Sequence, residues 1–256
     1  DTFKDVFSLE GRAALVIGGG GLGKPIAHAL LQNGADVIVA DINPAAAKDL
    51  QALAQEEKRR CLGLEVDLLS EESICGMVQH AQAAFGRIDI LVNAAGINIL
   101  KPAEEYDAAA WDKVLGINLR GLHLVTSRVA RGMIAQRYGR ILSVSSVKAF
   151  IGTDRDYAAY CASKGALNAY TRQIACEWGR YGITCNALAP TFTRTPINAF
   201  QLDDPVFYQK LVERIPLGRI CTTYDLGCAA VFLCSDAAAF ITGQVLGVDG
   251  GITAKQ

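Results

Sequence analysis

The sequence predicts an α/β fold in which one parallel sheet carries helices on both faces. Short apolar runs alternate with longer helical patterns along the 256 residues. Most of the short runs are continuously apolar, as in parallel strands that are buried on both faces. The links between runs and helical patterns are short, which is typical of repeated strand–helix–strand units. We therefore expect a doubly wound sheet of about seven strands.

The strands and helices are predicted in order along the chain. The strand-like runs cover residues 13–18, 36–41, 61–67, 88–93, 140–145, 183–189 and 244–248. The helical patterns cover residues 22–33, 44–58, 71–85, 108–136, 157–178 and 223–235. Ligands of such sheets bind at the carboxyl ends of the strands, so functional residues are expected directly after the strand-like runs.

One segment breaks the alternation. The length favours a single domain over residues 1–256. Within it, residues 191–218 contain Pro196, Pro205 and Pro216 and two short helical stretches. A long irregular excursion in a compact domain is usually functional. We expect a substrate lid at about residues 191–218.

The composition excludes several classes of protein. Hydrophobic residues make up 51% and charged residues 20%, as in a globular enzyme rather than a disordered chain. The 25 basic and 26 acidic side chains nearly cancel, which does not favour nucleic acid or an anionic membrane as a partner. No apolar run reaches the roughly 18 residues of a membrane helix, and the first residues, DTFKD, are too charged for a signal peptide.

The eight cysteines favour neither a disulfide framework nor a metal site. No two form a CxxC pair, and only three histidines could serve as co-ligands. Free thiols in apolar segments commonly behave as small buried side chains. Such segments contain Cys61, Cys176, Cys185, Cys228 and Cys234. Buried free thiols, no metal and a reducing cytoplasm are therefore expected.

A glycine-rich loop, GGGGLG at residues 18–23, lies between the first predicted strand and the first predicted helix. Glycines allow a tight turn and let backbone N–H groups approach a pyrophosphate at the positive end of a helix. The position of the loop predicts a dinucleotide site that includes Gly18, Gly21, Leu22 and Gly23.

Asp41 ends the second predicted strand. A carboxylate at this position accepts the ribose hydroxyls of adenosine and repels a 2′-phosphate. The next residues, Ile42 and Asn43, offer no basic side chain to such a phosphate. The sequence therefore predicts NAD rather than NADP.

Tyr160 and Lys164 stand four positions apart in a predicted helix and so share one face. A phenol with a pKa of about 10 is a poor acid–base group at neutral pH, and a neighbouring ammonium stabilises its phenolate. Tyr157 lacks this partner, because Cys161 stands four residues after it.

Other polar residues accompany this pair. Ser145 and Ser146 end the fifth predicted strand, where a hydroxyl can hydrogen-bond a carbonyl oxygen. The sequence VNAAG ends the fourth predicted strand at residues 92–96. Asn118 lies within a long helical pattern, where an asparagine is mildly unfavourable unless it has a partner.

Taken together, these motifs resemble those of the short-chain dehydrogenase/reductase family, over nearly the whole chain. Residues 18–23 resemble the TGxxxGxG loop, 93–96 the NNAG motif and 160–164 the YxxxK motif. Pro190 and Thr195 resemble PGxxxT, and residues 242–251 resemble the C-terminal signature. The resemblance implies a Rossmann-like single domain that transfers a hydride between NAD and a secondary alcohol or ketone.

The resemblance also implies roles for single residues. Tyr160 is expected to be the general acid–base, and Lys164 to lower its pKa and bind the nicotinamide ribose. Ser146 is expected to orient the carbonyl, and Asn118 to hold a water that links Lys164 to solvent. Further cofactor contacts are expected from Asp67 at the adenine, Asn93, Ala94 and Gly96 in the cleft, and Pro190 and Thr195 near the nicotinamide.

The chain departs from the family pattern at three motifs. The glycine loop is one residue shorter, with Ile17 in place of Thr. Ala94 replaces the second Asn of NNAG, and Thr191 replaces the Gly of PG. None of these changes removes a chemical group that the reaction needs.

The substrate is predicted from fewer residues. Those expected to face it are Asn98, Lys148, Arg155 and Arg194, with Phe192, Ile197 and Phe200 from the lid. Lys148 and Arg155 could clamp a carboxylate, although exposed basic side chains on loops are more often simply solvated. The central and C-terminal segments resemble sugar-acid, keto-sugar and polyol dehydrogenases.

Two other functions compete with this interpretation. The 3-oxoacyl-carrier-protein reductases are similar in sequence but usually prefer NADPH, which Asp41 disfavours. A nucleotide-binding protein without catalysis is expected to lack one of Ser146, Tyr160, Lys164 or Asn118, and this chain has all four. Family members are usually tetramers, so the resemblance implies a homotetramer.

Overall fold

The computed structural model describes residues 3–153, 156–195 and 198–255 and contains a seven-stranded parallel sheet. The strand order is β3-β2-β1-β4-β5-β6-β7, so the winding direction reverses between β1 and β4. The strands are β1 (Ala13–Ile17), β2 (Asp36–Asp41), β3 (Cys61–Glu65), β4 (Ile90–Asn93), β5 (Gly139–Val144), β6 (Ile183–Pro190) and β7 (Val245–Val248). The predicted doubly wound sheet is confirmed, and every strand lies at a predicted run.

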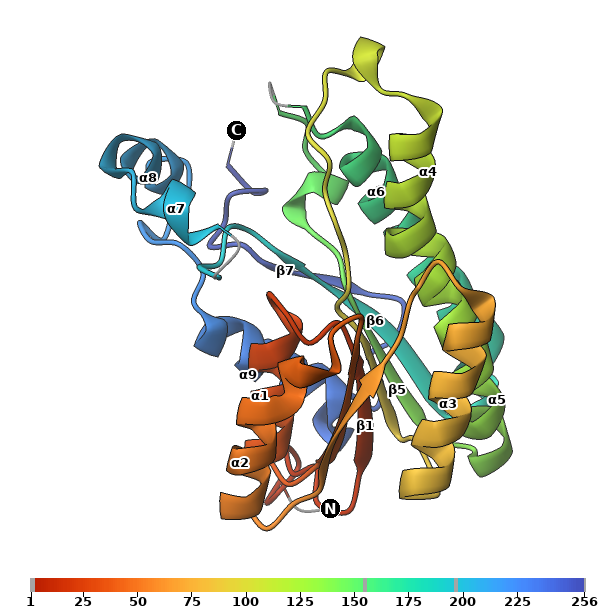
Figure 1. Cartoon of the computed structure of the whole chain (residues 1–256). Helices are drawn as coiled ribbons and strands as arrows, with labels where there is room; N and C mark the ends of the chain where they lie inside the picture. The colour runs from red at the N-terminus through yellow and green to blue at the C-terminus, as the bar shows by residue number, and fades with distance from the viewer. Residues whose placement is uncertain (1–2, 154–155, 196–197, 256) are drawn as a thin grey trace.

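Helices cover the two faces of this sheet (Figure 1). One face carries α1 (Gly23–Gln32), α2 (Lys48–Glu56) and α9 (Thr223–Cys234), and the other carries α3 (Glu71–Phe85), α5 (Leu122–Gln136) and α6 (Ala158–Trp178). The central strands β1, β2, β4, β5 and β6 are buried between two hydrophobic clusters, one on each face, whereas the edge strands β3 and β7 are partly exposed. This double cover explains why the strand sequences are continuously apolar.

The predicted helix over residues 108–136 is interrupted. It consists of α4 (Ala108–Leu115), a π-helical turn at Gly116–Gly121, and α5. The fully buried Asn118 lies in this turn and bonds the chain after β4. Single π-helical turns inside α-helices are frequent at functional sites.

Two short helices stand away from the sheet, near the C-terminus (Figure 1). They are α7 (Ala199–Leu202) and α8 (Pro205–Val212), close to the two helical stretches expected between residues 191 and 218. Leu202, Leu211 and Ile215 from this segment pack with Val147 and Ile252 in a third hydrophobic cluster. We call the described part of residues 191–218 the lid segment.

The cysteine prediction was wrong at two positions. All eight cysteines are free thiols, and Cys185 and Cys234 are buried as expected. Cys176 and Cys228, however, are exposed, because they lie on the outer faces of α6 and α9. Among the described residues, no cluster of His, Cys, Asp and Glu could hold a metal ion, and no helix is long and apolar enough to cross a membrane.

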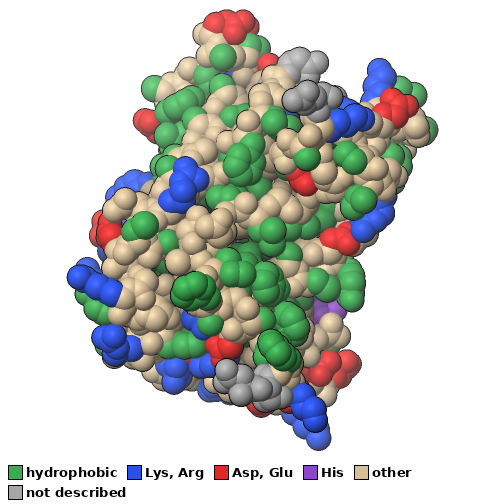
Figure 2. All heavy atoms as spheres, turned by 180° about the vertical axis from the view of Figure 1, so that it is seen from behind, with side chains coloured by type: hydrophobic (Ala, Val, Ile, Leu, Met, Phe, Trp, Pro, Cys, Tyr) green, Lys and Arg blue, Asp and Glu red, His purple; other side chains and the backbone are tan. Residues whose placement is uncertain are grey.

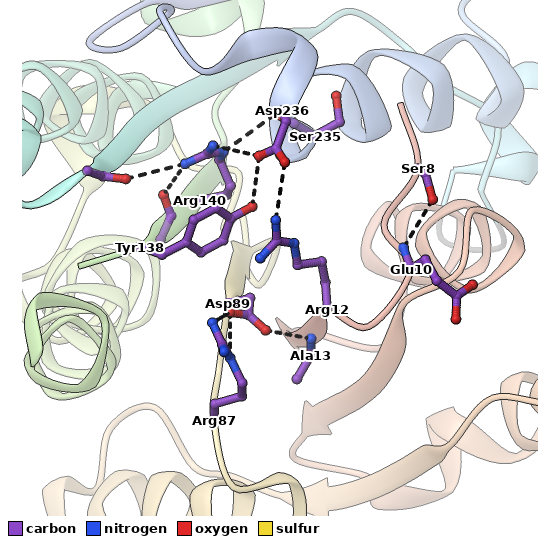
Figure 3. A network of polar contacts seen from close by, with 12 residues as sticks. Ser8, Glu10, Arg12, Ala13, Arg87, Asp89, Tyr138, Arg140, Ser235 and Asp236 are labelled. Atoms are coloured by element: carbon purple, nitrogen blue, oxygen red, sulfur yellow. Dashed lines mark hydrogen bonds and ion pairs between the residues drawn. The ribbon is translucent and has the colours of Figure 1, made fainter. Parts of the chain in front are cut away.

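A network of ion pairs and hydrogen bonds lies at the amino-terminal edge of the sheet (Figure 3). Asp236 pairs with Arg12 at 3.1 Å and with Arg140 at 2.9 Å, and it accepts a hydrogen bond from the Tyr138 hydroxyl at 3.2 Å. Both guanidinium groups also lie over the Tyr138 ring. The contacts join the starts of β1 and β5 to the chain after α9.

Candidate active site

A cavity of about 790 Å³ lies at the carboxyl edge of the sheet. Its wall is built from the segments that follow β1 to β6. It includes Gly18, Gly20, Gly21, Leu22, Asp41, Asp67, Ala94, Gly96, Ser146, Tyr160, Lys164, Pro190 and Thr195. The cavity therefore brings together most of the residues that the sequence singled out.

The glycine loop presents bare backbone to one end of the cavity. Gly18 has a φ of +94°, and a Cβ there would lie 2.7 Å from the backbone of Ala95. A Cβ at Gly23 would lie 1.8 Å from the carbonyl oxygen of Gly18. Gly23, which the sequence placed among the cofactor contacts, lies behind the wall, where it lets the loop pack on the first turn of α1.

At Gly20 an added Cβ would meet no atom within 4 Å, so the loop backbone is open toward the cavity. An open glycine loop at the start of a helix fits the pyrophosphate of a dinucleotide. These residues are therefore suited to hold a nicotinamide dinucleotide.

Asp41 is fixed beside this loop. Its Oδ2 accepts a hydrogen bond from the Gly19 N–H at 2.7 Å, and its Oδ1 accepts one from the Asn43 N–H at 3.0 Å. Asp67 similarly accepts a bond from the Leu69 N–H at 2.9 Å. Two acidic side chains thus border the end of the cavity at β2 and β3.

Tyr160 and Ser146 meet at the other end of the cavity. Tyr160 lies in the first turn of α6, and Ser146, which follows β5, lines the same cavity. Burial raises the pKa of Tyr160 to about 12, and hydrogen bonding to Ser146 lowers this pKa by a smaller amount. The Ser145 hydroxyl instead points at the carbonyl oxygen of Lys164, 3.5 Å away. The geometry favours Ser146 over Ser145 as the partner of the phenol.

Lys164 is buried beneath Tyr160, with 3% of its surface exposed. Its Nζ donates a hydrogen bond to the Val144 carbonyl oxygen at 2.7 Å and lies 5.6 Å from the centre of the Tyr160 ring. Burial lowers the pKa of Lys164 to about 8. The amine thus titrates close to neutral pH in the folded protein.

Asn118 lies next to this amine but behind the cavity wall. Its Oδ1 accepts a hydrogen bond from the Ile97 N–H at 2.8 Å, and its Nδ2 donates to the Ile97 carbonyl oxygen at 2.9 Å and to the Ser163 Oγ at 3.1 Å. A Cβ at Gly96 would lie 3.3 Å from Lys164 Nζ and 3.4 Å from Asn118 Oδ1. Gly96 therefore fits between the two groups.

Asn93 points into the protein rather than into the cavity. Its Nδ2 donates to Thr126 Oγ1 at 2.9 Å and contacts Ser143 Oγ at 3.5 Å, which ties β4 to α5 and β5. Its Oδ1 is buried and has no hydrogen-bond partner among the described residues. Asn93 therefore shapes the cleft from below, and its neighbours Ala94 and Gly96 form the wall.

The predicted substrate residues are distributed unevenly. Asn98 and Lys148 line the cavity, as does Phe192. Arg194, which the sequence placed among the substrate residues, is not part of this wall: it pairs with Asp203 at 2.7 Å and donates to the Leu202 carbonyl oxygen. Phe200 is 72% exposed and lies outside the wall. Arg155 and Ile197 fall outside the described residues.

Sequence reasoning missed several wall residues. They are Lys113, Tyr157, Thr191, Thr193, Asn198 and Gln201. The Oδ1 of Asn198 accepts a hydrogen bond from the Thr195 N–H at 2.8 Å, and its Nδ2 donates one to the Thr193 carbonyl oxygen at 2.9 Å. Asn198 therefore fixes the loop that carries Thr195. The position of Tyr157, three residues before Tyr160 at the start of the same helix, could have indicated a place in the wall, although Tyr157 has no lysine four residues after it.

The family pattern described as enoyl-(acyl carrier protein) reductase matches residues 17–253. The chain is 38% identical to D-threitol dehydrogenase of Mycolicibacterium smegmatis, over 97% of this chain and 95% of the relative. It is 36% identical to the NAD-dependent glycerol dehydrogenase of Listeria innocua, over 99% of this chain and 98% of that relative. A solved gluconate 5-dehydrogenase from Burkholderia cenocepacia, in complex with NADP and tartrate, superimposes with a TM-score of 0.92 at 36% identity, over 98% of this chain and 99% of that one.

The burial of Lys164 has a measurable consequence. Its pKa falls from 10.5 to about 8 on folding, so between these values the unfolded chain binds the proton more tightly and stability rises with pH. Relative to Lys164→Met, the wild-type free energy of unfolding should increase by about 2 kcal/mol from near pH 7 to near pH 10. Urea unfolding of both proteins across this range tests the shift. A difference that stays constant with pH would contradict it.

Proposed function

We propose that this chain, which belongs to the short-chain dehydrogenase/reductase family, is an NAD-dependent dehydrogenase of sugars, sugar acids or polyols. The chain is an oxidoreductase that acts on a secondary alcohol or its ketone. The observation that carries the proposal is that Ser146, Tyr160 and the buried Lys164 line one cavity together with the glycine loop.

Three groups would hold the cofactor. The glycine loop would hold its pyrophosphate, Asp41 the ribose of its adenosine, and Lys164 the ribose of its nicotinamide. A nicotinamide dinucleotide, when bound, supplies the acceptor or donor of the hydride. The protein's own part is to hold the alcohol oxygen between Ser146 and Tyr160 and to move its proton. Asn118 keeps the backbone beside Gly96 in place, and in this proposal it also borders the water that connects Lys164 with solvent.

The two pKa shifts define what each residue contributes. A buried phenol with a pKa of about 12 keeps its proton and can donate it to a carbonyl oxygen during reduction. To accept a proton during oxidation, the phenol needs a positive charge nearby, which protonated Lys164 supplies. Ser146 donates a hydrogen bond to the substrate oxygen and so orients it, while keeping its own proton.

The choice of NAD rests on Asp41. The similar gluconate 5-dehydrogenase was solved with NADP, so membership of the family does not decide the cofactor. In this chain the Asp41 carboxylate is held at the cavity by Gly19 and Asn43, and Ile42 follows it. A fixed negative charge favours ribose hydroxyls and disfavours a 2′-phosphate.

The substrate class is proposed from polar side chains of the cavity wall. Asn98, Lys148 and Gln201 line the cavity and offer donors and acceptors to several hydroxyl groups. Relatives named for threitol, glycerol and gluconate support a polyhydroxylated substrate. With Arg194 held by Asp203, the cation that we propose for a substrate carboxylate is Lys148.

We also propose a homotetramer in a reducing cytoplasm. Hydrophobic side chains gather over the middle of the face shown in Figure 2. Beside and on β7, Phe240 and Leu246 are exposed, and a second copy could cover them. The eight free thiols support a reducing environment.

Replacing Tyr160 tests the acid–base assignment. Tyr160→Phe removes the hydroxyl and keeps the ring, so turnover should fall by about 1,000-fold, while NADH affinity, followed by fluorescence, changes by less than about twofold. Tyr170→Phe, on the same helix but outside the cavity wall, is the matched control and should keep most of the activity. Retained turnover in Tyr160→Phe would overturn the assignment.

Replacing Asp41 tests the cofactor preference. Asp41→Ala removes the charge, so the ratio of kcat/KM with NAD to that with NADP should fall by at least about tenfold. Asp67→Ala, at the end of the neighbouring strand, should weaken both cofactors and leave the ratio nearly unchanged. If the ratio does not move in Asp41→Ala, the carboxylate does not select NAD.

A further inference from the structure

The chain after β7 folds into a tight turn around Asp249. This carboxylate is only 9% exposed. Its Oδ1 accepts a hydrogen bond from the Gly251 N–H at 2.9 Å, and its Oδ2 accepts bonds from the Thr253 N–H at 3.1 Å and from the Thr253 hydroxyl at 2.5 Å. One side chain therefore organises residues 249–255, which we call the C-terminal brace.

The brace is packed against the end of the lid segment. The Leu217 N–H donates to the Gly250 carbonyl oxygen at 3.1 Å, and Lys255 Nζ donates to the Glu213 carbonyl oxygen at 2.8 Å. The contact is close, since a Cβ at Gly250 would lie 2.6 Å from the Ile215 side chain. The brace thus holds the chain just after α8 at two backbone positions.

Apolar packing carries this contact to the substrate end of the cavity. Ile252 of the brace belongs to the third hydrophobic cluster, with Leu202 of α7 and Leu211 of α8. Val147, the residue after Ser146, is in the same cluster, and Phe192 of the cavity wall packs against it. No residue of the glycine loop or of β2 belongs to this cluster.

We propose that Asp249 is a positioning residue, which through the C-terminal brace fixes the lid segment and thereby sets the affinity for the alcohol but not for the cofactor. The part that concerns alcohol affinity rests on the proposed function. The part that concerns the lid segment rests on the contacts alone. Asp249 itself need not touch either ligand, because its effect passes through Gly250, Ile252 and the packed lid helices.

The chain offers a matched control at the opposite edge of the sheet. Asp89 is fully buried, accepts the Ala13 N–H at 3.0 Å and pairs with Arg87 (Figure 3). Asp89→Asn and Asp249→Asn each weaken the acceptor capacity of a buried carboxylate, and both should lower the melting temperature. Only Asp249→Asn should act on the lid segment.

Hydrogen exchange of the full-length protein, followed by mass spectrometry, tests the structural part. In Asp249→Asn, peptides covering α7 and α8 should exchange at least about tenfold faster than in the wild type. The peptide covering the glycine loop should be unchanged, and Asp89→Asn should leave the lid peptides unchanged. Thr253→Val, which removes one of the three hydrogen bonds, should give a smaller change in the same direction and serves if Asp249→Asn does not fold.

Steady-state kinetics test the functional part, with D-threitol and gluconate as the alcohols. Asp249→Asn should raise the KM for the alcohol by about fivefold or more, while NADH affinity stays within about twofold. Unchanged lid exchange, or a KM effect shared by Asp89→Asn, would overturn the proposal. Faster lid exchange with an unchanged KM would refute the link to alcohol affinity. Absence of turnover in the wild type would instead count against the substrate class, and the exchange result would still decide the role of the brace.

Discussion

All strands of the sheet run parallel, and this constraint places every strand's carboxyl end at one edge of the molecule. Because the order reverses between β1 and β4, the segments that leave the strands diverge there and leave room for a ligand. The glycine loop, Asp41, the Ala94–Gly96 backbone and Ser146 then share one cavity although they are far apart in the sequence. At the opposite edge, the Asp236 network ties the starts of β1 and β5 to the chain after α9 (Figure 3).

The chemistry that we propose for the cavity depends on two groups, Tyr160 and Lys164, whose pKa values burial shifts in opposite directions. The Tyr160 phenol is made harder to ionise and the Lys164 amine easier to neutralise. Desolvation causes both pKa shifts, because burial disfavours the charged form of each group. An ammonium beside a phenolate opposes both shifts, because each charge stabilises the other. The Val144 carbonyl oxygen and the first turns of α6 hold the amine under the phenol.

Under the proposed function, the cavity divides into two halves with different supports. The cofactor half consists of strand ends and a glycine loop that lie next to the main core. The alcohol half is bounded by the lid segment, which has its own small hydrophobic cluster and is held by the C-terminal brace. A division of this kind would let the lid segment vary with the substrate while the cofactor half stays the same.

The sequence alone predicted the sheet and most helices, because apolar runs and glycines follow from local constraints. It also singled out Ser146, Tyr160 and Lys164, which the structure brings to one cavity. Lid contacts were predicted poorly, since side chains there are placed by partners distant from the active site. Arg194 forms an ion pair with Asp203, and the Phe200 side chain is exposed to solvent. The interruption of the helix at Asn118 was also missed, because it depends on a bond to Ile97 in another segment.

The most direct test of the central claim is the initial rate of the purified protein with NAD and, separately, NADP. The panel of substrates would include polyols, sugars, sugar acids and 3-hydroxyacyl thioesters, followed by absorbance of the reduced cofactor. We expect turnover of polyhydroxylated secondary alcohols with NAD, and a preference for acids over neutral polyols if Lys148 binds a carboxylate. Turnover of thioesters alone, with NADP as the preferred cofactor, would contradict both the substrate class and the role of Asp41.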